Sequence, residues 1–100
     1  MQANPNLTNY SAILAQKHGA IGTPEREEFD NRARTYYMGL ALQGARKEEH
    51  ITQQELARRT GTSKSYISRV ENGLIDPTFT SFLKIVNALG LRLELTRPMA

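Results

Sequence analysis

Short polar and basic side chains gather between residues 63 and 73, where their spacing suits directed hydrogen bonding. If this stretch is helical, a rotation of about 100° per residue places five of them within about 140° of one another. These five polar residues are Lys64, Ser65, Ser68, Arg69 and Asn72. The opposite face is apolar and holds Tyr66, Ile67 and Val70. Because arginine and lysine bond guanine and asparagine bonds adenine in the major groove, the pattern indicates a helix that can read DNA.

The residues before this helix indicate how it would be held in place. Thr52 and Glu55 have the spacing of a capping box, which predicts that another helix begins there and ends at Gly61. Ser63 is placed to cap the polar helix, so that two short helices are joined by a glycine turn. Ser63 and Gln53, at the two helix starts, are also placed to hold DNA phosphates.

A polar helix face is by itself more often a solvated surface than a binding site, so the charge distribution matters. The chain has 100 residues and a formal net charge of +3. Residues 53–75 hold four basic and two acidic side chains, whereas residues 1–22 carry a single charge, on Lys17. The basic excess therefore lies where the two short helices are predicted, which favours DNA as the partner.

The rest of the chain predicts a helix on each side of this motif. Thr23 and Pro24 begin a helix that runs to about residue 48, although Gly39 and Gly44 weaken it and a break at either is one alternative. Its apolar residues lie on two faces, which is typical of a helix that packs against two surfaces. A further helix spans residues 79–89, with Thr78 placed to cap it and most of its apolar residues on one side.

Residues 91–95 alternate leucine with Arg92 and Glu94, which predicts a short β-strand. The three leucines would share one face of that strand. A single strand is not stable alone, so it needs a partner strand in this chain or in another.

Together these elements predict an all-α fold, a compact bundle of about five helices with a helix-turn-helix, an N-terminal helical extension and a short C-terminal β-strand. Residues 1–22 are expected to be loosely ordered or to bind a partner. Residues 23–96 are expected to form the main domain, with its motif at residues 52–72, and residues 97–100 a tail.

Beyond these patterns, the sequence ITQQELARRTGTSKSYISRVENG resembles the helix-turn-helix of the XRE family of phage-repressor-like regulators, and the resemblance covers about residues 39–92. It implies that seven side chains face DNA, namely Gln53, Ser63, Lys64, Ser65, Ser68, Arg69 and Asn72. It also implies that Arg46 and Glu71 form a buried pair that clamps the first helix against the recognition helix; the alternative is two unrelated surface charges. Thr60 and Thr62 stand where the family usually has apolar residues, so slightly weaker packing is expected at the turn.

The region before the motif, GTPEREEFDNRARTYYMGLALQGARKEEHITQQELA, resembles HigA-type antitoxins. This second resemblance implies a homodimer that represses its own operon and neutralises a RelE/HigB-like ribonuclease toxin. The side chains expected to contact the toxin are Leu7, Tyr10, Ile13, Leu14, Phe29, Tyr36 and Tyr37. One alternative is a stand-alone XRE-family transcriptional regulator, in which apolar residues of this kind cover the core or a dimer interface. Another is a protein-interaction module that no longer binds DNA.

Other kinds of chemistry find little support in the sequence. There is no cysteine, and His18 and His50 are the only histidines, so no metal site is expected. The chain has no glycine-rich phosphate loop and no paired catalytic motif, so neither an enzyme nor a cofactor is expected. No apolar run approaches the roughly 20 residues of a membrane span, and the first residues lack the features of a secretory signal. A cytoplasmic location is the resulting expectation.

Overall fold

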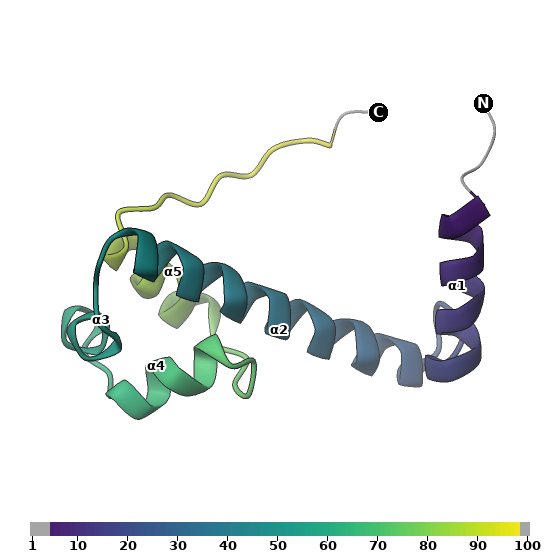
Figure 1. The fold of residues 1–100 in the computed structure, drawn as a ribbon, viewed down its shortest axis with the longest axis horizontal. Coiled ribbons are helices and arrows are strands. Elements are labelled where there is room, and N and C mark those ends of the chain that lie inside the picture. Colours follow the sequence, from purple (N-terminus) through teal and green to yellow (C-terminus); the bar gives the residue numbers. More distant parts are fainter. Residues whose placement is uncertain (1–4, 99–100) are drawn as a thin grey trace. The chain divides into compact units, whose positions relative to one another are not determined.

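A computed structural model describes the chain from residue 5 to residue 98, with side chains from Tyr10 onward. These residues form five helices, which are α1 (Pro5–His18), α2 (Pro24–Glu48), α3 (Gln53–Thr60), α4 (Lys64–Glu71) and α5 (Phe79–Ala88) (Figure 1). The predicted all-helical fold is confirmed for this part of the chain. None of the five helices is both long and apolar enough to cross a membrane.

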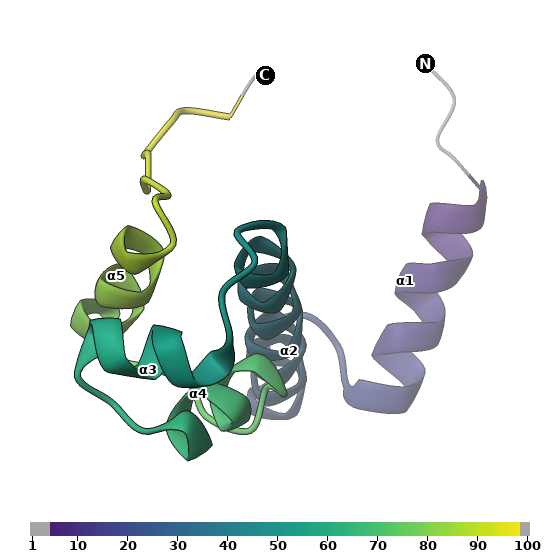
Figure 2. The same cartoon turned by 60° about the vertical axis from the view of Figure 1, so that its left-hand side comes forward.

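The chain divides inside α2 into two compact units, the N-terminal unit of residues 1–34 and the C-terminal unit of residues 35–100. Because α1 lies in the N-terminal unit, the bundle around the motif consists of the second half of α2 together with α3, α4 and α5. Figure 2 shows these three short helices gathered beside that half of α2.

In the N-terminal unit, the end of α1 is fixed against the first turns of α2. The Arg26 guanidinium is buried and donates hydrogen bonds to Asp30 Oδ1 at 3.1 Å and to the Gly19 carbonyl oxygen at 3.3 Å. The His18 ring stacks on Phe29, with the ring centroids 3.8 Å apart. The predicted N-terminal helical extension is therefore present as α1, tied to α2 by a charge and by a ring contact.

The three short helices begin where the sequence predicts. Thr52, Ser63 and Thr78 precede α3, α4 and α5 in extended backbone conformations, and each side-chain oxygen accepts a hydrogen bond from the amide three residues later. α3 ends at Gly61, whose φ of 67° is a left-handed conformation that favours glycine. The predicted capping box is only half formed, since the Glu55 carboxylate bonds two arginines of its own helix rather than the Thr52 amide.

The core of the C-terminal unit is a set of buried aliphatic side chains from α2, α3, α4 and α5 and from the cap of α5. They are Leu42, Leu56, Ala57, Ile67, Val70, Ile85, Val86 and Leu89. Leu56 and Ile67 are each 1% exposed, so truncation of either to alanine is expected to cost about 2–5 kcal/mol. Thr60 is also buried, and its hydroxyl donates to the Leu56 carbonyl oxygen at 2.9 Å, which satisfies its polar group where an apolar residue was expected. The core thereby holds the apolar face of α4 inward.

α2 is continuous from Pro24 to Glu48, so a break at Gly39 or Gly44 does not occur. Gly39 is buried against the last turn of α4, where an added Cβ would lie 2.5 Å from the Val70 carbonyl oxygen. Close packing therefore compensates for the low helix propensity of this glycine. Around Gly44, by contrast, no atom beyond the neighbouring residues and backbone of α2 lies within 4 Å of an added Cβ.

The prediction of a β-strand at residues 91–95 is wrong for this chain taken alone. Within residues 5–98 no strand is present, and residues 91–98 have no regular secondary structure. A strand requires a neighbour that completes its backbone hydrogen bonds. The last backbone bond of this segment runs from the Leu91 amide to the Val86 carbonyl oxygen at 3.0 Å, and none of the described residues supplies a second strand.

Candidate nucleic-acid interface

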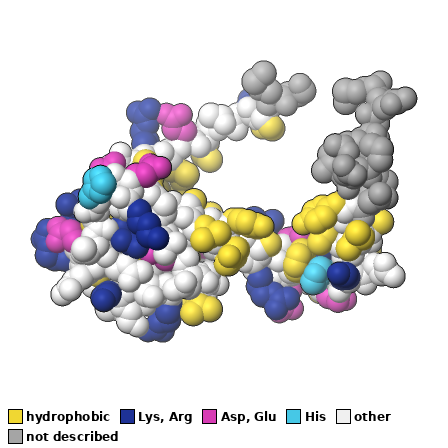
Figure 3. All heavy atoms as spheres, in the orientation of Figure 1, with side chains coloured by type: hydrophobic (Ala, Val, Ile, Leu, Met, Phe, Trp, Pro, Cys, Tyr) yellow, Lys and Arg dark blue, Asp and Glu magenta, His cyan; other side chains and the backbone are white. Residues whose placement is uncertain are grey.

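The predicted reading face of α4 lies at the surface. Lys64, Ser65, Arg69 and Asn72 are exposed, Ser68 is half-buried, and the capping residue Ser63 is exposed as well. On the other side of the helix, Ile67 and Val70 are buried in the core. Polar and apolar side chains are thus separated by the helix axis, which leaves the polar face accessible to a ligand. Figure 3 shows basic side chains over the region of α3 and α4.

Hydrogen bonds run along this face and orient its longer side chains. The Arg69 guanidinium donates to Ser65 Oγ at 3.1 Å, one turn earlier in the helix. Asn72 is the C-cap of α4, and its Nδ2 donates to the Ser68 carbonyl oxygen at 2.8 Å. Arg69 is therefore partly preorganised for a contact in front of the helix, whereas Asn72 must leave the Ser68 carbonyl to make two hydrogen bonds to an adenine.

A buried ion pair fixes the end of α4 to α2. Arg46 and Glu71 form a two-pronged pair, with Nε to Oε2 at 2.7 Å and Nη2 to Oε1 at 3.0 Å. The Glu71 side chain is 1% exposed and the Arg46 side chain 10%. Arg46 Nη1 also donates to the Ile51 carbonyl oxygen at 2.8 Å, just before α3. Planar, paired hydrogen bonds of this kind are directional, so the pair sets how α2, α3 and α4 meet.

Gln53 joins Arg46 and Glu71 in one hydrogen-bonded cluster, and the sequence did not indicate this third member. It was predicted to hold a phosphate, but its Nε2 donates to Glu71 Oε1 at 3.0 Å and the residue is half-buried. Its role is therefore at least in part to complete the hydrogen bonding of Glu71. The two residues are eighteen positions apart, and the family resemblance implied only that Gln53 faces DNA.

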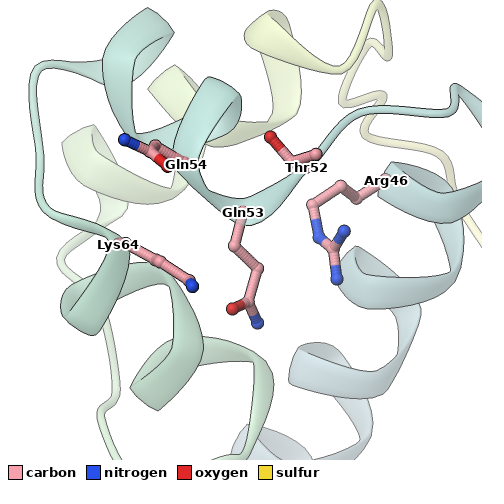
Figure 4. A pocket seen from close by; sticks show the side chains of 5 residues that line it. All are labelled: Arg46, Thr52, Gln53, Gln54 and Lys64. Carbon is pink, nitrogen blue, oxygen red and sulfur yellow. The ribbon is translucent and has the colours of Figure 1, made fainter.

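Beside the cluster, an open recess of about 410 Å³ separates the start of α3 from the start of α4 (Figure 4). It is lined by Arg46, Thr52, Gln53, Gln54 and Lys64. Figure 4 shows Gln53 extending between Lys64 and Arg46. Helix N-termini and a lysine both favour an anion, so the recess suits a phosphate group. The sequence identified Lys64 and Gln53 for the site but not Thr52 or Gln54, although their place at a helix start was a usable signal.

On α3, two further basic residues are paired with an acid. Hydrogen bonds from Arg58 and Arg59 lower the pKa of Glu55 from 4.5 to about 2. The Arg58 guanidinium lies 2.5 Å from the carboxylate and that of Arg59 3.1 Å. Two of the four basic side chains in the motif region are thus partly neutralised by Glu55, and the cations of α4, Lys64 and Arg69, have no acid within ion-pair distance among the described residues.

The seven side chains predicted to contact a toxin are divided between the two units. In the N-terminal unit Tyr10 and Ile13 are exposed and Leu14 is half-buried, as is Phe29 beneath the His18 ring. The side chain of Leu7 falls outside the described residues. In the C-terminal unit, the rings of Tyr36 and Tyr37 meet edge to face at 5.5 Å and remain 50% and 67% exposed. Figure 3 shows hydrophobic side chains gathered over the middle of α2.

Comparison with known proteins gives a consistent set of relatives. The model of the Helix-turn-helix family matches residues 42–95. An HTH-type transcriptional regulator of Sinorhizobium fredii is 32% identical over 62 residues, 62% of this chain and 32% of the relative. The ImmF control region 10 kDa protein of Bacillus phage phi105 is 32% identical over 60 residues, 60% of this chain and 67% of the relative. The immunity repressor protein of the same phage is 29% identical over 57 residues, and the match spans 40% of its length.

A solved structure agrees with these sequence matches. The restriction-modification controller protein C.AhdI from Aeromonas hydrophila superposes with a TM-score of 0.61 and 28% identity, over 63% of this chain and 91% of that one. Several of the relatives are longer, since this chain spans only about a third of the Sinorhizobium fredii regulator. The family match itself covers the end of α2 and all of α3, α4 and α5.

Proposed function

The chain belongs to the helix-turn-helix family, and from this we propose that it is a sequence-specific DNA-binding transcriptional repressor that acts as a homodimer. The observation that carries the proposal is α4, whose apolar face is buried in the core while Lys64, Ser65 and Arg69 are exposed. The Arg46–Glu71 pair holds this helix at a fixed angle to α2. The relatives named as transcriptional regulators and as an immunity repressor support the same assignment.

In the proposed complex, α4 enters the major groove and contacts base edges with Lys64, Ser65, Ser68 and Arg69. Asn72 joins them if its amide leaves the Ser68 carbonyl. The recess between α3 and α4 takes a phosphate, held by Lys64 and Gln53, which line it, and by the amides at the start of α3. Phosphate contacts set the position of the helix, and base contacts supply the selectivity.

A homodimer follows from the small footprint of one such helix. An eight-residue helix contacts only a few base pairs, which is too short a sequence to select one operator in a genome. Two copies related by a twofold axis would read two half-sites about 34 Å apart, one turn of the double helix. The expected operator is therefore an inverted repeat.

The test is selection of bound sequences from a random DNA pool, followed by anisotropy titrations on the selected site and on a shuffled one. A repressor of this kind is expected to enrich an inverted repeat and to prefer it by at least about 10³-fold. Its affinity should fall steeply between about 50 and 200 mM salt, because phosphate contacts release counterions. No enriched sequence, together with a shallow salt dependence, would identify a protein-interaction module instead.

A second, narrower role is favoured by the exposed aromatic residues on α2. Tyr36 and Tyr37 are large, exposed side chains on α2 rather than on the proposed reading helix, and aromatic side chains are enriched where proteins bind proteins. We propose that this surface binds a RelE/HigB-like ribonuclease toxin, which makes the protein an antitoxin that represses its own operon. The alternative is a stand-alone regulator, a role that the names of the relatives fit equally well.

Co-expression with the product of the adjacent gene distinguishes these two roles. An antitoxin is expected to co-purify with a small basic ribonuclease and to rescue growth from it. The double substitution Tyr36→Ala and Tyr37→Ala should weaken rescue, whereas Phe79→Ala, which removes an equally exposed ring from α5, should not. If the adjacent gene encodes no such ribonuclease, the stand-alone regulator is the remaining role.

A further inference from the structure

Residues 91–95 leave α5 with all of their side chains exposed. Leu91 and Leu93 are nearly half exposed, and Leu95 is 98% exposed. Figures 1 and 2 show this segment running away from the helices as an open trace. Among the described residues, no backbone amide or carbonyl of residues 92–98 forms a hydrogen bond with another backbone group. An alternating segment with unpaired backbone groups is a template for a second strand.

We propose that residues 91–95 pair with the same residues of a second copy, as an antiparallel two-stranded sheet centred on Leu93. The proposal rests on the homodimer of the proposed function and names the surface that forms it. In this register Leu93 lies opposite Leu93 of the second copy, and Leu91 lies opposite its Leu95. Arg92 lies opposite Glu94 of the second copy, and Glu94 opposite its Arg92.

The charges select this register. Opposite residues of an antiparallel pair share one face, so the centred register gives one face of six leucines and one face of two complementary ion pairs. A centre moved to residue 92 places arginine opposite arginine, and a centre moved to residue 94 places glutamate opposite glutamate. A shift that offsets the pairing by one residue places leucines opposite charges. Among these registers, only the one centred on Leu93 places leucine opposite leucine on one face and opposite charges opposite each other on the other face.

The partner strand comes from a second copy of the chain because the segment is complementary to itself. Within one chain Arg92 bonds Glu94 two residues away, and both side chains are largely exposed. An exposed pair of this kind contributes little, so exchanging it for two pairs across the sheet costs little. The strand also begins directly after Gly90, which turns the chain out of α5 with a φ of 73°.

The experiment uses charge reversal and measures dimer dissociation by sedimentation, without DNA. Arg92→Glu leaves only acids on the polar face and Glu94→Arg only bases, so each variant should dissociate about tenfold or more readily than the wild type. An equimolar mixture of the two variants should form heterodimers about as tightly as the wild type forms homodimers. The double variant Arg92→Glu with Glu94→Arg should also recover.

The mixture separates pairing between chains from the contact within one chain, because each variant lacks an internal ion pair whether mixed or alone. A wild type that stays monomeric, single variants that dimerise normally, or a mixture no tighter than its components would each overturn the proposal. None of these results depends on DNA. A monomer that still selects one sequence would therefore refute the strand pairing and leave DNA recognition standing.

A cross-link tests the register directly, and the natural sequence contains no cysteine to interfere. Leu93→Cys should give a disulfide-linked dimer under mild oxidation, because the two Cα atoms would lie roughly 4.5–5.5 Å apart. Leu95→Cys is the matched control. Its two copies would be four residues out of register, roughly 14 Å apart, which is too far for a disulfide. Equal cross-linking of the two variants would refute the centred antiparallel register.

Discussion

Gly39 of α2 and Val70 of α4 are so close that a Cβ added to Gly39 would lie 2.5 Å from the Val70 carbonyl oxygen. The carbonyl oxygen of Glu71 would lie 2.6 Å from the same Cβ. This crossing lies two turns of α2 before Arg46, whose guanidinium bonds the Glu71 side chain. Two contacts at the last turn of α4, one steric and one ionic, thus fix the direction of the helix that is proposed to read DNA.

The glycine contact predicts opposite effects for the same substitution at two positions of α2. Gly39→Ala is expected to destabilise the fold by about 1–3 kcal/mol, because backbone atoms must move apart to admit the methyl group. Gly44→Ala is the matched control, since its added Cβ would meet no atom beyond the neighbouring residues and backbone of α2 within 4 Å. It should stabilise the protein by about 0.5–1 kcal/mol through helix propensity. Urea unfolding of both variants measures the difference, and effects of the same sign would contradict the crossing.

A structural feature can be predicted from the sequence when the interaction that forms it joins residues close together in the chain. The caps at Thr52, Ser63 and Thr78 were found because each bonds an amide only three residues away. The tight crossing at Gly39 was not, because a glycine inside a helix signals only low propensity until the opposing backbone is known. In the same way Gln53 could be placed at a helix start but not assigned to Glu71, since that bond depends on how α3 meets α4.

The alternation in residues 91–95 also shows that a local pattern does not decide whether an element forms. Period two correctly describes how Leu91, Leu93 and Leu95 would share a face, but a strand is defined by its neighbour. Since no neighbour is available among the described residues of one chain, the pattern cannot be realised there. Sequence periodicity thus specifies which side chains share a face, and only tertiary or quaternary contacts decide whether the element forms.

The buried ion pair predicts that removing one of its charges destabilises the fold more than removing both. Arg46→Met is expected to cost about 3–5 kcal/mol, because it leaves the Glu71 carboxylate buried without its cation. Arg46→Met combined with Glu71→Leu should recover most of that loss, since no charge remains buried. Arg59→Met, which removes an exposed arginine from α3, should change stability by less than about 1 kcal/mol. The free energy of unfolding in denaturant measures these effects. If the loss in the double variant equals the sum of the losses in the two single variants, the two side chains do not stabilise the fold as a pair.

The turn after α2 predicts a stabilising substitution. His50 has a φ of 56°, the left-handed conformation that glycine adopts without steric cost. His50→Gly is therefore expected to raise the free energy of unfolding by about 1 kcal/mol. Glu49→Gly, one residue earlier and without a positive φ, should instead lower it by up to about 1 kcal/mol. Thermal unfolding distinguishes the two, and a loss at position 50 would mean that the imidazole has a role in the turn.

The two arginines on α3 predict that the free energy of unfolding falls at acid pH. Because Arg58 and Arg59 lower the pKa of Glu55 from 4.5 to about 2 in the folded state, ionised Glu55 stabilises the fold above pH 4.5. That contribution should disappear as the pH falls from about 4.5 to about 2. NMR titration of the Glu55 carboxyl carbon is expected to give a midpoint near 2. The shift should shrink in high salt, since both arginines are exposed to solvent, and a midpoint near 4.5 would show that the arginines do not hold the carboxylate.

The last prediction concerns Arg69, which the Ser65 hydroxyl orients on the exposed face of α4. Arg69→Ala is expected to weaken binding to the selected operator by about 1–3 kcal/mol, roughly a tenfold to hundredfold rise in Kd, and to relax the preference at one base pair of each half-site. Lys84→Ala, which removes an exposed positive charge from α5, should weaken specific and shuffled DNA equally and slightly. Because both variants lose one charge, the difference between them isolates base recognition from electrostatic attraction. If Arg69→Ala weakens binding to both DNAs by the same factor, Arg69 contacts phosphate, and the selectivity of α4 must come from its serines and Lys64.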